Sequence, residues 1–92
     1  PTRLALASGP TPWTAATTIR FDLPQASDVT LRVLDLNGRV VRTLESGALP
    51  AGTRAVTWAG GDDQGAPLPA GIYLLQLNAG GEQVTQRTVF VR

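Results

Sequence analysis

The chain of 92 residues contains no cysteine, no histidine, no methionine and no lysine, so all eight of its basic side chains are arginine. Without cysteine there is no disulfide framework and no thiolate nucleophile. Without histidine the chain lacks the commonest general base and the commonest metal ligand. Without lysine it cannot form a Schiff base with a carbonyl substrate. These absences predict a protein that is not an enzyme and that carries no cofactor.

Charge and long hydrophobic runs are also scarce. Eight arginines stand against seven carboxylates, which gives a formal net charge of +1 at pH 7. The arginines are spread along the chain, whereas nucleic-acid binding needs a clustered basic patch. No apolar run approaches the roughly 20 residues of a membrane span. We therefore expect neither a nucleic-acid partner nor a membrane-spanning segment.

The dominant pattern that is present has a period of two. Apolar and polar residues alternate over six segments, which are residues 17–23, 29–36, 39–45, 53–58, 72–78 and 83–91, with residues 3–7 a candidate seventh. No segment has the 3.6-residue period of an amphipathic helix. Short strands separated by frequent turns predict a single all-β domain with two packed antiparallel sheets. Its predicted core consists of Phe21, Leu31, Val33, Val56, Trp58, Tyr73, Leu75 and Leu77.

Two hairpin turns are predicted between strands. Asn37-Gly38 is a strong hairpin signal because both residues tolerate positive φ, and we expect Asp35 and Arg39 to pair across it. The second turn is residues 79–82, which contain two glycines. Residues 46–52 and 59–70 are rich in glycine, proline and small side chains, so both are predicted to be loops.

Two strands have an ambiguous phase. After Val33 the alternation slips over residues 34–36, which indicates either a bulge or a strand covered on both faces. In residues 72–78 the inward set is either Tyr73, Leu75 and Leu77 or Ile72, Leu74 and Gln76, and the first is preferred because it is fully apolar. In the last strand, whose phase is not ambiguous in this way, Val89 and Val91 are predicted to be the buried pair.

Two further features could bind a ligand. Asp62 and Asp63 lie in a glycine-rich loop, where they are either weak calcium ligands or the closing residues of an Asx turn. Trp13 lies between Pro12 and Thr14, where it either closes one end of the sandwich or is an exposed aromatic used in surface recognition. Neither alternative is decided by the sequence.

Four blocks in a fixed order point to a family. They are residues 17–24 (TTIRFDLP), residues 29–41 (VTLRVLDLNGRVV), the VTW and DDQG of residues 56–65, and residues 68–77 (LPAGIYLLQL). Together they resemble the C-terminal sorting domains of the type IX secretion system and the related immunoglobulin-like domain of flagellar hook-capping proteins. The resemblance covers about residues 9–92. It implies an immunoglobulin-like antiparallel β-sandwich of six to seven strands over 9–92, with residues 1–8 a linker or first strand.

The resemblance also implies a function. Such a domain is non-catalytic and directs an exported cargo, joined at its N-terminal side, through the outer membrane to the cell surface or medium. Its partners would be the outer-membrane secretion machinery and a surface sortase, with the periplasm crossed in transit. Carried over by motif, the recognition residues would be Pro69, Gly71, Tyr73, Leu74, Leu75, Arg87, Val89, Val91 and Arg92. The last strand, if it lies at a sheet edge, would offer unpaired N–H and C=O groups to the receptor.

Two other functions stay open. An immunoglobulin-like sandwich also serves as an inert spacer or accessory module of a multidomain secreted enzyme, because fold does not fix function. A carbohydrate-binding module would use Trp13 as its stacking surface.

Overall fold

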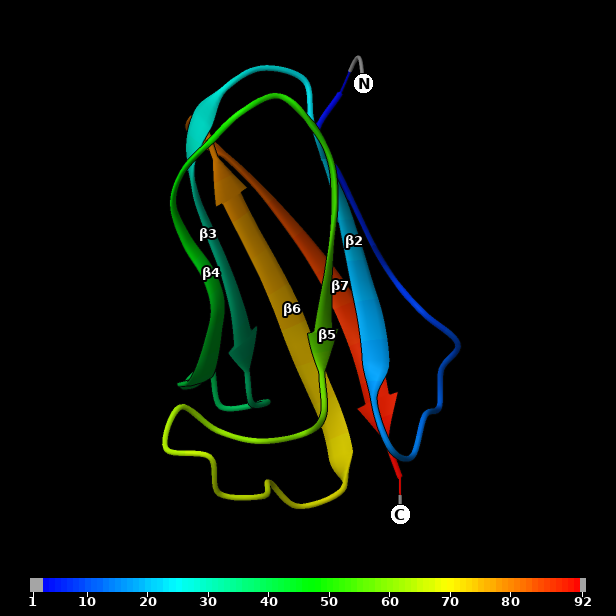
Figure 1. The fold of residues 1–92 in the computed structure, drawn as a ribbon. Coiled ribbons are helices and arrows are strands. Elements are labelled where there is room, and N and C mark those ends of the chain that lie inside the picture. The colour runs from blue at the N-terminus through cyan, green and yellow to red at the C-terminus, as the bar shows by residue number, and fades with distance from the viewer. Residues whose placement is uncertain (1–2, 92) are drawn as a thin grey trace.

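The computed structural model describes residues 3–91, which form seven strands. In chain order these are β1 (Ala5–Ser8), β2 (Thr17–Leu23), β3 (Ser27–Leu34), β4 (Val40–Leu49), β5 (Gly52–Trp58), β6 (Gly71–Ala79) and β7 (Glu82–Phe90). They make a three-stranded sheet of order β1-β2-β5 and a four-stranded sheet of order β4-β3-β6-β7. Figure 1 shows the two sheets packed as layers. The immunoglobulin-like β-sandwich expected from the sequence is confirmed.

The first strand belongs to this sandwich. Ala5 of β1 pairs with Asp22 of β2, and Ser8 pairs with Ile19. Of the segment 1–8, residues 1 and 2 lie outside the described residues, as does Arg92 at the other end. None of the described residues belongs to a helix with the length and hydrophobicity needed to cross a membrane.

The core between the sheets follows from the alternation. Residues 19, 21 and 23 of β2 and residues 73, 75 and 77 of β6 point inward and are buried. Burying one such side chain stabilises the fold by about 1.5–3 kcal/mol relative to leaving it in water. Seven of the eight predicted core residues are buried, and Val56 is half-buried against the cluster. The predicted inward set of β6 is confirmed.

The prediction of a loop over residues 46–52 is wrong, because β4 continues to Leu49. Ser46 and Gly47 pair with Thr30 and Val29 of β3. β4 is the edge strand of its sheet, so small polar side chains can face water while the backbone completes a ladder on one side. The register of the β3–β4 pair shifts between Leu31 and Arg32 and again between Val33 and Leu34. The second shift lies where the alternation of the sequence slips.

The Asn37-Gly38 turn forms, but in a different geometry from the one predicted. Gly38 has φ +84°, while no described residue other than glycine has a positive φ. The Gly38 N–H donates to the Asp35 carbonyl at 3.0 Å, and the Asp35 N–H donates to the Arg39 carbonyl at 3.0 Å. This is the three-residue loop in which a left-handed glycine follows a type I turn. The predicted ion pair is confirmed, with Arg39 Nε 3.5 Å from Asp35 Oδ2.

The phase predicted for β7 is wrong. Thr88 and Phe90 are buried, whereas Val91 is exposed and Val89 half-buried. The reason is the two-residue turn at Gly80-Gly81, which pairs Ala79 with Glu82. That register places Thr88 opposite Tyr73, so the even-numbered residues of β7 share the core face of β6.

Candidate functional site

The residues predicted to contact a receptor lie on the β6–β7 hairpin and the segment before it, and the structure divides them into two groups. Tyr73 and Leu75 point into the core and are buried. The Tyr73 hydroxyl donates a hydrogen bond to the carbonyl of Pro69. A tyrosine at the start of this strand that bonds to the backbone just upstream is the tyrosine corner of immunoglobulin-like domains.

This geometry separates the predicted recognition residues by their burial. In the folded domain a partner cannot contact Tyr73 or Leu75 directly, because the opposite sheet covers them. The tyrosine corner instead fixes how the segment from Pro69 to Gly71 enters β6. Both Tyr73 and Leu75 are members of the hydrophobic core cluster.

The second group points away from the core. Across β6 and β7, Leu74 pairs with Arg87, and Val89 pairs with Ile72, which is not one of the predicted recognition residues. Because side chains alternate between faces, these four lie on the outer face of the four-stranded sheet. Val91 follows directly after β7 and is exposed. Arg92 lies outside the described residues.

The outer face carries a row of apolar residues at this end of the sheet. Leu34 of β3 pairs with Leu74 of β6 on one side and with Val40 of β4 on the other. Leu34 is 9% exposed, yet it is not a member of the hydrophobic core cluster. We call the five residues Val40, Leu34, Leu74, Ile72 and Val89 the outer patch. The slip in alternation after Val33 is therefore explained by a β3 that carries apolar residues on both faces.

The edge of β7 beside this patch is already occupied. The Trp13 N–H donates to the Val89 carbonyl at 3.0 Å, and the Val91 N–H donates to the Trp13 carbonyl at 2.9 Å. The Val89 N–H donates to Oγ1 of Thr11 at 3.1 Å. The prediction that the end of the last strand offers unpaired backbone groups is therefore wrong at Val89 and Val91. β7 pairs with β6 alone over Glu82 to Thr88 among the described residues.

The opposite edge of the same sheet is covered in a similar way. The Asp63 N–H donates to the carbonyl of Val41 in β4 at 3.1 Å. The Thr43 N–H donates to Oδ1 of Asp63 at 2.9 Å. Next to it, Oδ1 of Asp62 accepts the amides of Gln64 and Ala66, each at 2.9 Å.

These bonds identify the role of the two aspartates. They close the loop of residues 59–70 and attach it to β4, so the Asx-turn interpretation is confirmed. Within residues 3–91 no three acidic side chains lie close enough together to hold a metal ion.

Trp13 is buried, with 5% exposure, so of the two alternatives left open by the sequence the closing of one end of the sandwich is the correct one. Its ring stacks on Phe90 at a centroid distance of 4.5 Å and meets Trp58 edge-on at 5.2 Å. Trp58 in turn meets Tyr73 edge-on at 5.6 Å. Such aromatic pairs stabilise by about 0.5–1.5 kcal/mol beyond the area they bury. Trp13 therefore closes one end of the sandwich and gives no stacking face to a sugar.

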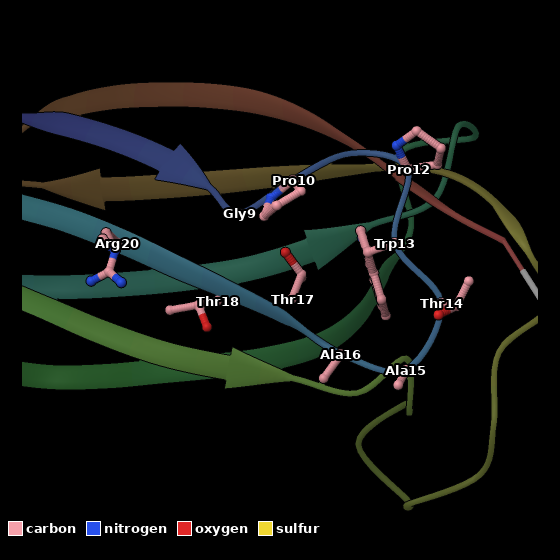
Figure 2. A pocket seen from close by; sticks show the side chains of 10 residues that line it. All are labelled: Gly9, Pro10, Pro12, Trp13, Thr14, Ala15, Ala16, Thr17, Thr18 and Arg20. Atoms are coloured by element: carbon pink, nitrogen blue, oxygen red, sulfur yellow. The ribbon is translucent and has the colours of Figure 1, made fainter.

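Beside Trp13 lies an open hollow of about 480 Å³ between the segment after β1 and the start of β2. Figure 2 shows Thr17 and Thr18 pointing to opposite sides of β2, with Arg20 at one end of the hollow. Arg20 is the only ionisable side chain among the described residues that line it. An arginine without a carboxylate or imidazole supplies no general acid–base pair.

Comparison with known proteins identifies the family of this domain. The sequence profile of the family described as "FlgD Ig-like domain" matches residues 9–83. The chain belongs to the FlgD Ig-like domain family. The match includes the tyrosine corner and ends at Gln83, so Arg87, Val89 and Val91 lie beyond it.

Two relatives are similar to the chain in sequence, and two solved structures are similar to it in fold. The chain is 42% identical over 74 residues to the "Basal-body rod modification protein FlgD" of Salmonella typhimurium, and 40% identical to that of Escherichia coli K12. These matches cover 77% of this chain and 32% of the relatives, so the chain spans about a third of their length. FlgD of P. aeruginosa superposes with a TM-score of 0.64 at 22% identity, over 97% of this chain and 76% of that one. Dimeric latent PorU from Porphyromonas gingivalis superposes with a TM-score of 0.67 at 17% identity, over 96% of this chain and 9% of that one.

Proposed function

We propose that this domain of the FlgD Ig-like family is a non-catalytic sorting module. Joined to the C-terminal side of an exported cargo, it directs that cargo across the outer membrane to the cell surface or medium. Its partners are the outer-membrane secretion machinery and a surface sortase, and it passes through the periplasm in transit. It carries no cofactor.

One observation carries this proposal. Among the residues matched to the sorting-domain motifs, Leu74, Arg87 and Val89 lie together on one outer face. The buried residues of the same motifs, Tyr73 and Leu75, build the fold that holds this face in place. A receptor can therefore recognise the folded hairpin by its side chains, without a catalytic group. The four sequence blocks that resemble type IX sorting domains support the same interpretation.

A fusion-export assay tests the proposal. The chain is joined to the C-terminus of a periplasmic reporter enzyme in a bacterium that has a type IX secretion system. We expect reporter activity at the cell surface or in the medium, and retention in the periplasm when Leu74→Glu is introduced. Retention of the unmodified fusion would contradict the proposal.

The control must preserve the fold. Deleting residues 89–92 is unsuitable because it removes Phe90, which stacks on Trp13 in the core. Arg20→Glu changes an exposed side chain on the other sheet and should leave export unchanged. Thermal melting of the purified variants verifies that both remain folded.

A second candidate is a subdomain of a flagellar hook-capping assembly. The specific observation in its favour is the 42% identity to FlgD of Salmonella typhimurium over 74 residues. Replacing the matched segment of that protein with this domain tests the alternative. Motility of a strain lacking its own FlgD should return if the domain acts in the flagellar assembly and stay absent if it acts in sorting.

A further inference from the structure

We propose that the outer patch docks an apolar segment of a partner protein that carries carboxylates beside its apolar side chains. This inference rests on the proposed function and specifies the chemistry of the partner that binds the outer face of the four-stranded sheet. It follows from where the exposed apolar side chains lie, from the charges beside them, and from the blocked edges of the sheet.

The largest exposed hydrophobic side chains gather at one end of the molecule. They are Leu36 at 66%, Val40 at 40%, Ile72 at 37% and Val91 at 37% exposure. Each is at or next to the end of a strand of the four-stranded sheet, where β3 and β7 end and β4 and β6 begin. Figure 1 shows these four strand ends at the same side of the molecule. Exposed apolar side chains that cluster in this way, with polar residues around them, mark interaction sites.

Two arginines border the patch. Arg87 pairs with Leu74 and so extends the apolar row onto β7. Arg32 pairs with Gln76, one step further along the same face, and Gln76 pairs with Thr85. Away from the strand ends the outer face thus becomes polar.

Neither arginine is neutralised within the described residues. The ion pair formed there joins Arg39 to Asp35, and no carboxylate pairs with Arg32 or Arg87 over residues 3–91. A guanidinium recognises a carboxylate through two parallel hydrogen bonds. A partner that fits the patch therefore places acidic side chains next to its apolar ones.

The charges also argue against a second copy of this chain. A face-to-face pair would bring Arg32 and Arg87 of both copies into one interface, where like charges destabilise association. They also disfavour a membrane surface, because two arginines are fewer than the four to eight basic residues, roughly, of lipid-binding clusters. No tryptophan or tyrosine among the described residues is exposed on this face to anchor in headgroups.

The blocked edges determine how the partner binds. Trp13 occupies the β7 edge and Asp63 occupies the β4 edge at this end of the sheet. A partner strand cannot extend the sheet at either place. It must bind through side chains on the face, so apolar and charged contacts decide affinity.

Labelled synthetic peptides test this chemistry directly. Three short peptides share the same valine and leucine residues. Between these, the first peptide carries glutamate, the second glutamine and the third arginine. Binding of each peptide to the whole chain is followed by fluorescence anisotropy. We expect the glutamate peptide to bind at least about tenfold more tightly than the arginine peptide, a difference of about 1.4 kcal/mol. Arg87→Glu should reverse this preference, Leu74→Ser should weaken binding of the glutamate peptide, and Arg20→Glu should change neither.

Four outcomes would overturn the inference. The first two are equal affinity of the chain for the three peptides, and an Arg87→Glu variant that keeps the peptide preference of the unmodified chain. The third is binding only to vesicles of phosphatidylglycerol. The fourth is self-association of the chain that Leu74→Ser abolishes. The peptide assay does not depend on export. If the unmodified fusion stays in the periplasm while the peptide preference holds, the proposed sorting function fails and the docking chemistry stands.

Discussion

The indole Nε1–H of Trp13 donates a buried hydrogen bond of 2.8 Å to Oγ1 of Thr88, which lies 75 residues later in the chain. Trp13 belongs to the segment between β1 and β2, and Thr88 belongs to the last strand. The bond therefore joins the two ends of the fold at the place where the Trp13 backbone also pairs with Val89 and Val91. A buried tryptophan N–H needs such a partner, because leaving it unpaired costs free energy.

Thr88→Val should show the cost of breaking this bond. The substitution keeps the shape of the side chain and leaves the indole N–H without an acceptor, so we expect a loss of about 1–3 kcal/mol in the free energy of unfolding. Urea denaturation measures it. The double variant Thr88→Val with Trp13→Phe removes both polar groups and should lose less than the sum of the two single losses. Strictly additive losses would mean that the bond contributes nothing.

Gly60 should be far less tolerant of substitution than Gly65, although both have φ +83°. A Cβ at Gly60 would lie 2.8 Å from the Phe90 ring, whereas nothing lies within 4 Å of one at Gly65. Gly65→Ala should cost about 1–2 kcal/mol through backbone strain alone. Gly60→Ala adds a steric term of about 1–3 kcal/mol by displacing Phe90 from its stack on Trp13. Equal melting temperatures for the two variants would contradict this explanation.

The strands of the fold could be predicted because alternation decides which face of a strand is buried. The phase of β7 follows from the turn that precedes it. Once Gly80-Gly81 is taken as a two-residue turn, Ala79 must oppose Glu82 and Tyr73 must oppose Thr88. The predicted burial of Tyr73 then requires that Phe90, and not Val89, faces the core.

Other features could not be predicted because they depend on contacts between distant segments. The burial of Trp13 requires that the segment after β1 crosses to β7, and no local pattern encodes that crossing. The alternation alone cannot decide whether Leu34 belongs to a bulge or to a strand covered on both faces, because its apolar neighbours Val40 and Leu74 come from other strands. The motifs name Leu74 and Arg87 together with the buried Tyr73 and Leu75, and the alternation assigns Val89 to the core. Only the structure separates the outward residues of this set from the buried ones.

Asp62→Ala should destabilise the domain, whereas Asp62→Asn should not. Oδ1 of Asp62 accepts two backbone amides, and its carbonyl accepts a bond from the Arg42 guanidinium. Alanine loses the two side-chain bonds, for a cost of about 1–2 kcal/mol, while asparagine retains an oxygen at the same place. Thermal melting in calcium chloride and in EDTA should give the same midpoint for the unmodified domain. A calcium-dependent rise that Asp62→Asn removes would instead indicate a metal site.

Tyr73→Phe should lower stability and leave export intact, whereas Leu74→Glu should abolish export and leave stability nearly unchanged. The two residues are nevertheless neighbours in one motif. Tyr73→Phe removes the hydroxyl that bonds to the Pro69 carbonyl, so we expect a loss of about 1 kcal/mol in the free energy of unfolding. Because the outer face is unchanged, export of a fused reporter should persist at temperatures where the variant is folded.

Leu74→Glu changes a half-buried side chain on the outer face of the sheet, so it should alter stability little and abolish export. Denaturation curves and reporter localisation, measured on the same two proteins, separate the roles. If Tyr73→Phe abolished export while the domain stayed folded, the receptor would read the tyrosine corner itself, and the outer patch would not be the recognition surface.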